Sequence, residues 1–386
     1  MERSKPKILF TFVQAGMGHI APMEGICAEF EKKYGDKCEI VKSFVFEESE
    51  FPEVRKMAAI QSGHTKKMAN DFLYRKAEAF TYAFSSRFML FVLDRFYGKG
   101  RRSFFKDAKK VDPDLVVSSY YLPAHLYRQA NDKGLTHALL ATYSPDQIYP
   151  AWDRKCDLFL VNNDAAKRTV EKGRTYGKVL QIPFIYRKEV AENKRDKEQA
   201  RRAVGIKENR FTVLFTDGAY GDSRSEKFVS AIMRCGKKIN FIIVCGKNKR
   251  LFDDLSELAK GKNDGVDCYF VGFTDRISDY MLAADIIIGK AGSNTVMESL
   301  YLACPMIVNA ECNRLEELIT RRMLKDGLVM REHDPEKAVK MIEKFVDDDG
   351  ELKKMKKKFI PFHDASGAEK AADEIFALLK TRFPDL

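Results

Sequence analysis

The chain has 386 residues, of which 45% are hydrophobic and 32% are charged, and its formal net charge is +11 at pH 7. This length suits two domains with separate cores, and no segment approaches the roughly 18 uninterrupted apolar residues of a membrane-spanning helix. The eight cysteines are scattered without a C-x-x-C pair, which argues against a zinc ribbon or a redox motif and indicates reduced thiols in a cytosolic protein.

The chain opens with a predicted strand, a glycine turn and a helix. Residues 8–13 form the apolar run ILFTFV, Gly16–His19 form the turn, and the helix is expected over Met23–Lys33. This is the first βα unit of a doubly wound sheet, and the apolar run is too short for a signal peptide. A dinucleotide fingerprint fits poorly because the third glycine is missing from its offset, which leaves an NAD-linked dehydrogenase as the least supported alternative.

Residues 51–110 are rich in basic and aromatic side chains, and much of this segment is predicted to be helical. A basic, aromatic, amphipathic helix can lie in a membrane interface with its rings at the level of the headgroups. Alternatively, the aromatic rings pack onto the first domain and the lysines form a solvated face. The positive charge permits nucleic acid or anionic lipid as a partner, but no zinc-finger, RRM or helix-turn-helix signature accompanies it.

Further strands are expected at 114–118, 136–142 and 157–161, with a helix near 123–130. The loop Tyr143–Trp152 follows the second of these strands. Since α/β sheets bind ligands at the carboxyl ends of their strands, this loop is a candidate binding element, and Asp146 supplies a carboxylate within it.

The charged run Arg187–Arg202 predicts a domain boundary. Strands are then expected at 211–216, 239–245 and 266–271. The loop Asp217–Asp222 contains Gly218, and small residues at a strand end let the backbone approach a ligand closely. A simple turn is the alternative. Helices are predicted at 335–346, 352–359 and 368–379.

The segment Val271–Pro305 carries the strongest pattern in the chain. Ile286–Ile288 form a short buried strand, Gly289–Gly292 break it, and Ser293 or Asn294 is expected to cap the next helix. The first N–H groups of that helix and its dipole would form an anion site, and Glu298 lies one turn further on, within reach of a sugar hydroxyl. An ordinary βα turn is the alternative.

This stretch resembles the donor-binding core of the GT-B glycosyltransferases related to monogalactosyldiacylglycerol synthases and bacterial diacylglycerol glucosyltransferases, and more distantly the lipid II-forming GlcNAc transferase. In that family, G-F-x-(D/N) precedes D-x-x-I/L-x-K-x-G-x-x-T-x-x-E-x-x-x-x-x-x-P. The positions of this chain that match the pattern are Gly272, Phe273, Asp285, Lys290, Gly292, Thr295, Glu298 and Pro305.

The resemblance implies an α/β protein of the GT-B class, with two Rossmann-like domains whose parallel sheets face a central cleft. It implies an N-terminal acceptor domain at 1–186, a C-terminal nucleotide-sugar domain at 187–365, and a last helix at 366–386 that crosses back to the first domain. It also implies His19, in the family's G-x-G-H turn, as the general base. The implied donor-binding residues are Gly18, Gly218, Phe273, Thr274, Lys290, Gly292, Ser293, Asn294, Thr295, Glu298 and Glu316.

Two departures from the family pattern bear on the candidate site residues. In the loop after residue 142, Tyr149 stands before Pro150 where a histidine is usual, so that Asp146 and Tyr149 become the acceptor-side candidates. After Pro305, Leu315 occupies the position of a usual glutamine and Ile319 lies near that of an asparagine, whereas Glu316 matches.

The resemblance therefore implies an inverting hexosyltransferase that uses a UDP-sugar and a lipid acceptor, without a cofactor or a metal. Its partners would include an anionic membrane surface, at which it would act as a peripheral cytoplasmic enzyme, and nucleic acid is not expected among them. Two alternatives stay open. One is a GT-B transferase with a soluble or nucleic-acid acceptor. The other is a non-catalytic nucleotide-sugar-binding protein, suggested by Leu315 and Ile319.

Overall fold

The computed structural model describes residues 5–14, 17–60, 90–91, 94–95, 97–144, 153–173, 175–206, 210–217, 225–259 and 265–386. Packing divides the chain into two compact units. The first comprises Met1–Arg187 and Ala365–Leu386, and the second comprises Lys188–Asp364. No helix within the described residues is long and apolar enough to span a bilayer.

The first unit is built on a parallel sheet of six strands in the order β2-β1-β3-β4-β5-β6. Its strands are β1 (Lys7–Thr11), β2 (Glu39–Ser43), β3 (Leu115–Ser118), β4 (Leu139–Ser144), β5 (Leu158–Val161) and β6 (Lys178–Gln181). Its helices include α1 (Met17–Tyr34), α5 (Gly98–Val111), α6 (Tyr121–Asp132), α7 (Asp164–Lys172) and α17 (Gly367–Lys380).

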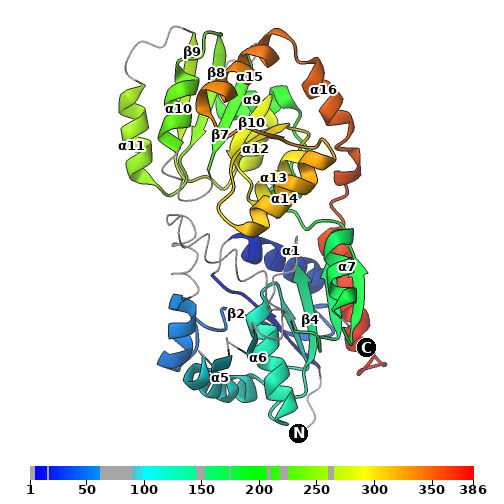
Figure 1. Cartoon of the computed structure of the whole chain (residues 1–386). Coiled ribbons are helices and arrows are strands. Elements are labelled where there is room, and N and C mark those ends of the chain that lie inside the picture. The colour runs from blue at the N-terminus through cyan, green and yellow to red at the C-terminus, as the bar shows by residue number, and fades with distance from the viewer. Residues whose placement is uncertain are drawn as a thin grey trace. The chain divides into compact units, whose positions relative to one another are not determined.

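Side chains on this sheet alternate between two apolar layers, as the pleat of a strand requires. In β1, Ile8 and Phe10 pack with α1 and α17, whereas Leu9 packs with α5 and α6 on the other face. Both faces are covered, which explains why these strands are apolar throughout rather than alternating with polar residues. Figure 1 shows α5 and α6 together beside this sheet.

The last helix, α17, packs against the first helix of the chain. The rings of Tyr34 and Phe376 stack with centroids 3.9 Å apart, and the Nζ atom of Lys33 lies 2.8 Å from Oδ1 of Asp373. These contacts attach the C-terminal residues to the unit that contains the N-terminus.

The second unit has its own parallel sheet of six strands, in the order β12-β11-β10-β7-β8-β9. The strands are β7 (Phe211–Thr216), β8 (Ile239–Val244), β9 (Val266–Val271), β10 (Ile286–Lys290), β11 (Met306–Ala310) and β12 (Met330–Arg331). The helices include α8 (Lys188–Ala191), α9 (Lys197–Val204), α10 (Ser225–Met233), α11 (Lys249–Leu258), α12 (Ile277–Ala283), α13 (Ser293–Tyr301), α14 (Arg314–Lys325), α15 (Pro335–Asp347) and α16 (Gly350–Lys357), followed by the 3₁₀ turn η1 (Ile360–Phe362).

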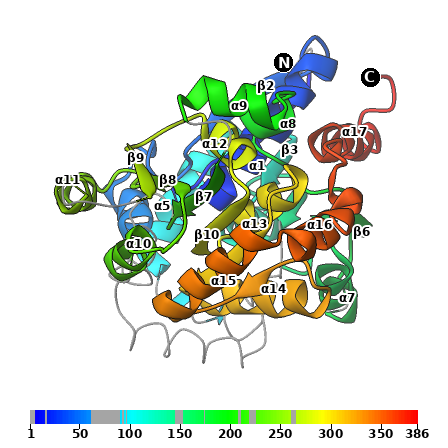
Figure 2. The same ribbon diagram turned by 90° about the horizontal axis from the view of Figure 1, so that it is seen from above.

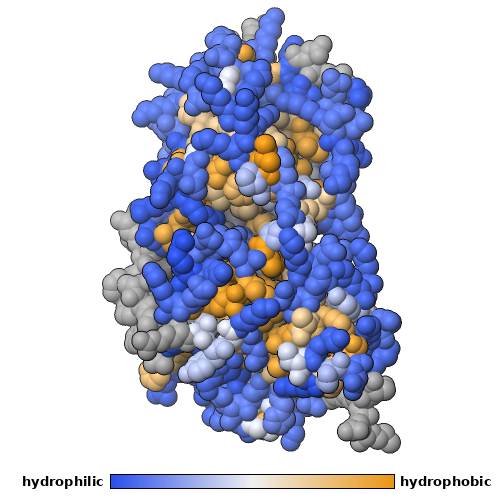
Figure 3. Space-filling view, turned by 90° about the vertical axis from the view of Figure 1, so that its right-hand side faces the viewer, coloured by the Kyte–Doolittle hydropathy of each residue, from blue (hydrophilic) through white to orange (hydrophobic). Residues whose placement is uncertain are grey.

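Helices cover both faces of this second sheet. The apolar side chains of α10 and α15 share one core with Val213, Phe215 and Ile243, while α9 and α12 pack together on the other side, as Figure 2 shows from above. The predicted α/β fold with two parallel sheets is confirmed. The face drawn in Figure 3 is mostly hydrophilic and shows smaller hydrophobic patches, in keeping with cores that lie inside each unit.

The charged run Arg187–Arg202 contains a helix that its composition does not indicate. Asp196 and Gln199 form a capping box at the start of α9, in which each side chain accepts a hydrogen bond from the other residue's backbone N–H. Arg201 of this helix is buried, and its Nη2 atom lies 2.8 Å from Oδ2 of Asp285. Asp285, a motif residue, thus serves to attach α9 to the second sheet.

The basic aromatic segment 51–110 lies partly outside the described residues. In the described part, Tyr97, Phe104 and Phe105 are buried in the core against α6, so for these three rings the membrane interpretation is wrong and the packing alternative holds. Phe91 is exposed. The rings pack inward because α5 covers one face of the sheet, a position that the sequence pattern alone does not specify.

Candidate functional site

The first candidate residue, His19, lies where the strand order of the first sheet reverses. From β1 the chain passes to β2 on one side and then to β3 on the other, so the carboxyl ends of β1 and β3 flank a switch point. Ligands of open α/β sheets bind at such points. His19 lies in the first turn of α1, directly after Gly18, and Ser119 follows β3.

The contacts of His19 specify its tautomer. The Nδ1 atom lies 2.9 Å from the carbonyl oxygen of Ser119. A carbonyl only accepts, so Nδ1 carries the hydrogen and, in the neutral ring, Nε2 carries the lone pair. The Ser119 hydroxyl donates back to the His19 carbonyl oxygen at 2.6 Å, and the Tyr120 ring packs edge-on at 4.9 Å between centroids. The imidazole is therefore held with Nε2 as the proton acceptor.

Burial sets the charge of this imidazole. It lowers the pKa of His19, and this effect outweighs the hydrogen bond to the Ser119 carbonyl, which raises the pKa. At neutral pH the ring is consequently neutral, as a general base must be.

Three of the predicted site residues lie outside the described residues. They are Asp146 and Tyr149 in the loop after β4, and Gly218 in the loop after β7.

The donor-side candidates cluster at the switch point of the second sheet. The chain passes from β7 to β8 and β9 on one side, and then to β10 on the other. The turn after β10 leads to Gly292, which is the N-cap of α13 with φ −63° and ψ 134°, and no side chain caps this helix. The expectation that Ser293 or Asn294 caps it is wrong, because the helix begins at Ser293 and its first turn contains Ser293, Asn294 and Thr295. The start of a helix is a place that favours an anion, because its first N–H groups and its dipole carry partial positive charge.

The approach of β10 to β7 explains one glycine in the motif. A Cβ atom at Gly289 would lie 2.1 Å from the carbonyl oxygen of Thr216, so the position admits only glycine. The register of β10 against β11 shifts between Gly289 and Lys290. This irregularity is typical of strand ends that re-aim a side chain.

The two predicted acidic residues are buried. Glu298 has no exposed surface, and Glu316 is 8% exposed. Glu316 Oε2 accepts a hydrogen bond from the Cys312 backbone N–H at 2.6 Å, while the Glu316 N–H donates to the Asn313 side chain at 2.9 Å. Glu316 therefore stabilises the start of α14. A donor role for either carboxylate stays a prediction that requires the side chain to become accessible.

Phe273, which follows β9, is 65% exposed, unusual for so large an apolar ring. The amino group of Lys247, which follows β8, lies 5.0 Å from the centre of this ring. Thr274 accepts a hydrogen bond from the Arg276 N–H at 3.0 Å and so shapes the turn into α12. An exposed ring with a cation beside it suits a flat, negatively charged ligand such as a nucleotide.

Sequence reasoning missed a buried polar cluster at the ends of β7 and β11. Asp217 Oδ2 accepts a hydrogen bond from the Ser225 hydroxyl at 2.5 Å, and Asp217 Oδ1 accepts one from the Asn309 side-chain amide at 3.1 Å. The bond from Ser225 joins the two residues that flank 218–224, and the bond from Asn309 ties Asp217 to β11. The signal was available, since Asp217 directly follows the apolar strand FTVLFT and Asn309 interrupts the apolar MIVNA.

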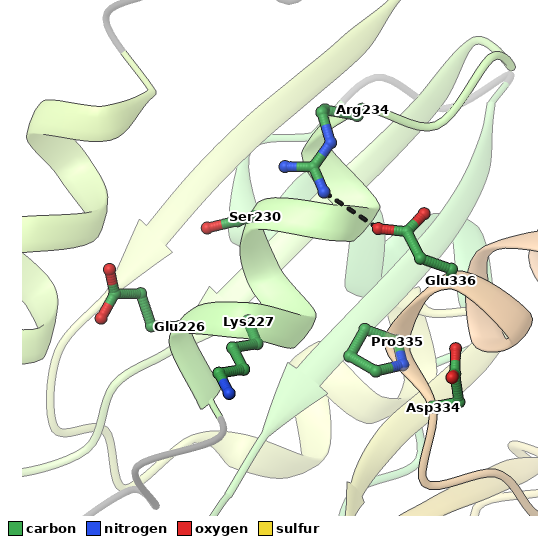
Figure 4. A pocket seen from close by; sticks show the side chains of 7 residues that line it. All are labelled: Glu226, Lys227, Ser230, Arg234, Asp334, Pro335 and Glu336. Carbon is green, nitrogen blue, oxygen red and sulfur yellow. Dashed lines mark hydrogen bonds and ion pairs between the residues drawn. The ribbon is translucent and has the colours of Figure 1, made fainter.

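A pocket of about 480 Å³ lies elsewhere on the second unit, between α10 and the start of α15. Figure 4 shows its mixed charges, with Arg234 bonded to Glu336 and Lys227 opposite Asp334. None of the predicted site residues lines it. Within the described parts of the chain, no group of three or more His, Cys, Asp or Glu side chains is placed to hold a metal ion.

Comparison with known proteins finds similar sequences and similar folds. Residues 212–375 match the glycosyltransferase family 28 C-terminal domain. The chain is 23% identical over 329 residues to the chloroplastic monogalactosyldiacylglycerol synthase of Spinacia oleracea, which covers 80% of this chain and 60% of that protein. It is 21% identical over 300 residues to the processive diacylglycerol beta-glucosyltransferase of Bacillus subtilis, with 75% and 78% covered. The chain thus spans about three-fifths of the length of the plant relative.

Solved structures share the fold over nearly the whole chain. MurG of Acinetobacter baumannii has a TM-score of 0.61 at 10% identity and covers 97% of this chain and 99% of its own. HepE of Anabaena, solved in complex with UDP-glucose, has a TM-score of 0.54 at 12% identity, with 97% and 100% covered. The fold, with two six-stranded parallel sheets covered by helices, is therefore that of GT-B proteins.

Proposed function

Since residues 212–375 carry the C-terminal domain of glycosyltransferase family 28, we propose that this protein is an inverting glycosyltransferase that moves a hexose from a UDP-sugar to a lipid acceptor. Diacylglycerol at a cytoplasmic membrane surface is the acceptor that its similarity to the lipid glycosyltransferases favours. The observation that carries the proposal is His19, a neutral imidazole whose Nδ1 is bonded to a backbone carbonyl and whose Nε2 is left to accept a proton.

In the proposed reaction, the acceptor hydroxyl gives its proton to Nε2 of His19 as its oxygen forms a bond to the anomeric carbon. The bond between that carbon and the diphosphate oxygen breaks, and its electron pair leaves with UDP. Attack from the face opposite the leaving group inverts the anomeric centre. The N–H groups at the start of α13 and the dipole of this helix stabilise the charge that develops on the diphosphate.

In the proposed donor site the uracil lies on Phe273, beside Lys247, and the diphosphate lies at Gly292–Thr295. Both places follow strands of the same parallel sheet, whose carboxyl ends share one edge. The exposed ring of Phe273 with Lys247 beside it supports the first placement, and the glycine N-cap of α13 supports the second.

The test is UDP release from UDP-glucose, UDP-galactose and UDP-GlcNAc, each with diacylglycerol vesicles and with vesicle-free buffer. We expect lipid-dependent release from one donor, and a loss of about 10²- to 10⁴-fold in kcat in His19→Ala, the usual contribution of a general base. His137→Ala is the matched control, because His137 is exposed on the same unit.

Release without lipid would point to a soluble acceptor. UDP binding without release from any donor would leave the non-catalytic alternative, and unchanged release in His19→Ala would remove the proposed base.

A further inference from the structure

Helix α16 of the second unit has an apolar side and a basic side. Leu352 and Met355 are buried, as is Phe359 just after the helix, and their i, i+3, i+7 spacing places them along one side. Figure 1 shows this helix at the outer edge of the second unit. Its other side, the lysine face, consists of side chains that are exposed to solvent, namely Lys353, Lys354, Lys357 and Lys358.

The nearby carboxylates leave most of the charge of the lysine face in place. Glu351 is paired with Lys344 of α15, at 2.7 Å between Oε2 and Nζ, and Asp349 is paired with Lys353 at 2.8 Å. In the part of the chain that the structure describes, the other lysines of the face form no ion pair. The face is therefore a local excess of positive charge that points into solvent.

An exposed apolar residue follows these lysines. Ile360 begins the 3₁₀ turn η1 and is 68% exposed, and the next residue, Pro361, is also exposed. The backbone stays helical through Lys358 and Phe359, so Ile360 lies one turn beyond Lys357, on the side of the lysine face. A single exposed apolar side chain is common on protein surfaces. Its place at the end of a row of lysines is what gives it meaning here.

A bilayer with anionic headgroups fits this surface better than a nucleic acid does. Clustered lysines are attracted to the phosphates of anionic lipids, and an apolar side chain beside them gains free energy by entering the boundary between headgroups and acyl chains. The backbone of a nucleic acid offers phosphates to the lysines but no apolar layer to Ile360.

We propose that the lysine face and Ile360 form a docking surface of the second unit for an anionic bilayer. The lysines bind the lipid phosphates, and Ile360 enters the interface beside them. The choice of a lipid partner rests in part on the proposed function, whose acceptor is a lipid. The docking surface lies outside the basic aromatic segment 51–110, and its binding to lipid requires no turnover of a UDP-sugar.

The experiment measures co-sedimentation of the full-length protein with phosphatidylcholine vesicles and with vesicles that also contain phosphatidylglycerol, at one fixed ionic strength. The first variant is the double substitution Lys354→Gln with Lys357→Gln, and the second is Ile360→Ala. The matched control is Lys337→Gln with Lys340→Gln. These two lysines of α15 are also exposed and three residues apart, so the control removes the same charge from another helix of the same unit.

We expect the α16 double variant to bind the phosphatidylglycerol vesicles about 10- to 30-fold more weakly, because each lysine close to an anionic surface contributes roughly fivefold. Ile360→Ala should weaken binding about three- to tenfold through the loss of inserted apolar surface. The α15 control should lose less than about twofold, because salt screens charges that are not in contact with the lipid. All the replaced side chains are exposed, so each variant should keep its thermal midpoint and its UDP affinity.

Equal weakening in the two double variants would overturn the proposal, since net charge alone would then account for binding. Unchanged vesicle binding in the α16 double variant or in Ile360→Ala would overturn it as well. Tighter binding to duplex DNA than to anionic vesicles, with the same loss in the α16 double variant, would assign the surface to a nucleic acid instead. If no UDP-sugar supports transfer, the proposed function fails, whereas vesicle binding still decides whether this docking surface exists.

Discussion

At the scale of single residues, two histidines of the first unit have pKa values shifted in opposite directions, His19 by burial and His125 by the carboxylates beside it. His19 has one acceptor beside it and a lowered pKa, whereas His125 has two carboxylates and a raised one. The surroundings of the same side chain thus favour the neutral ring at one position and the charged ring at the other.

The lowered pKa of His19 predicts the pH range in which kcat/KM falls on the acid side. A general base acts when it is deprotonated, so kcat/KM should fall as the pH drops through the pKa of His19. This pKa lies below the ordinary histidine value of about 6.5. Steady-state rates from pH 4.5 to pH 8, at fixed ionic strength, check this. An acid limb centred above pH 6.5 would contradict the assignment of His19.

The exposed position of Phe273 predicts that its replacement weakens UDP binding without lowering the stability of the fold. Stacking of a base on an aromatic ring contributes about 1–3 kcal/mol, so Phe273→Ala should weaken UDP binding by roughly 5- to 150-fold. The thermal midpoint should stay within about 1–2 °C, because the ring is exposed in the free protein. Calorimetric titration with UDP measures the first effect. Ile360→Ala, at another exposed apolar position of the same unit, is the control that should leave UDP binding unchanged.

At the scale of elements, the connection from β10 to α13 contains Gly289 and Gly292, and a different steric constraint applies to each glycine. Gly289 is required by the neighbouring strand, since a Cβ there would meet the Thr216 carbonyl oxygen. At Gly292 a Cβ would meet only Thr295 Oγ1, at an ordinary 3.7 Å, and the backbone angles suit any residue. The second glycine thus leaves space at the start of α13, where the diphosphate is proposed to lie.

The two glycines therefore give a matched pair of variants. Gly289→Ala should destabilise the second unit by about 1–3 kcal/mol or more, because β7 and β10 must separate. Gly292→Ala should fold like the unmodified protein and bind UDP more weakly, because a methyl group projects beside the helix N–H groups. Urea denaturation and UDP titration distinguish the two. Equal UDP affinity in Gly292→Ala would argue against a diphosphate at this turn.

At the scale of the whole molecule, the net charge of +11 remains the main argument for an anionic surface as partner. Burial of Tyr97, Phe104 and Phe105 removes three rings from that argument, which leaves charge and the exposed Phe91 to support it in the described part of segment 51–110.

Membrane attachment through charge predicts a strong dependence on salt. Binding to vesicles that contain phosphatidylglycerol should weaken about tenfold or more between 50 and 200 mM salt, and binding to phosphatidylcholine vesicles should be weak at both. Co-sedimentation measures both. Tighter binding to duplex DNA than to anionic vesicles, with a steep salt slope, would instead favour the nucleic-acid alternative.

The sequence alone determined the fold class and the places of most strands. Runs such as ILFTFV and III are too short and too apolar for anything but buried parallel strands, and glycine turns follow two of them. The resemblance to a known family made His19 a candidate, and the strand, glycine turn and helix in that order predicted the β10–α13 connection. These features depend on residues close together in the chain.

Only the tertiary structure decided which polar groups meet across long separations. The charged run at 187–202 holds a helix because Arg201 reaches Asp285, and Glu316 bonds to the Cys312 N–H at the start of α14. Phe104 is a core residue because α5 lies on the sheet, and His125 is paired on both sides because residues 94 and 153 fold onto α6. The physical reason is the same in each case. The spacing of apolar and polar residues specifies which face of a helix or strand is buried, but it does not specify which other element packs against that face.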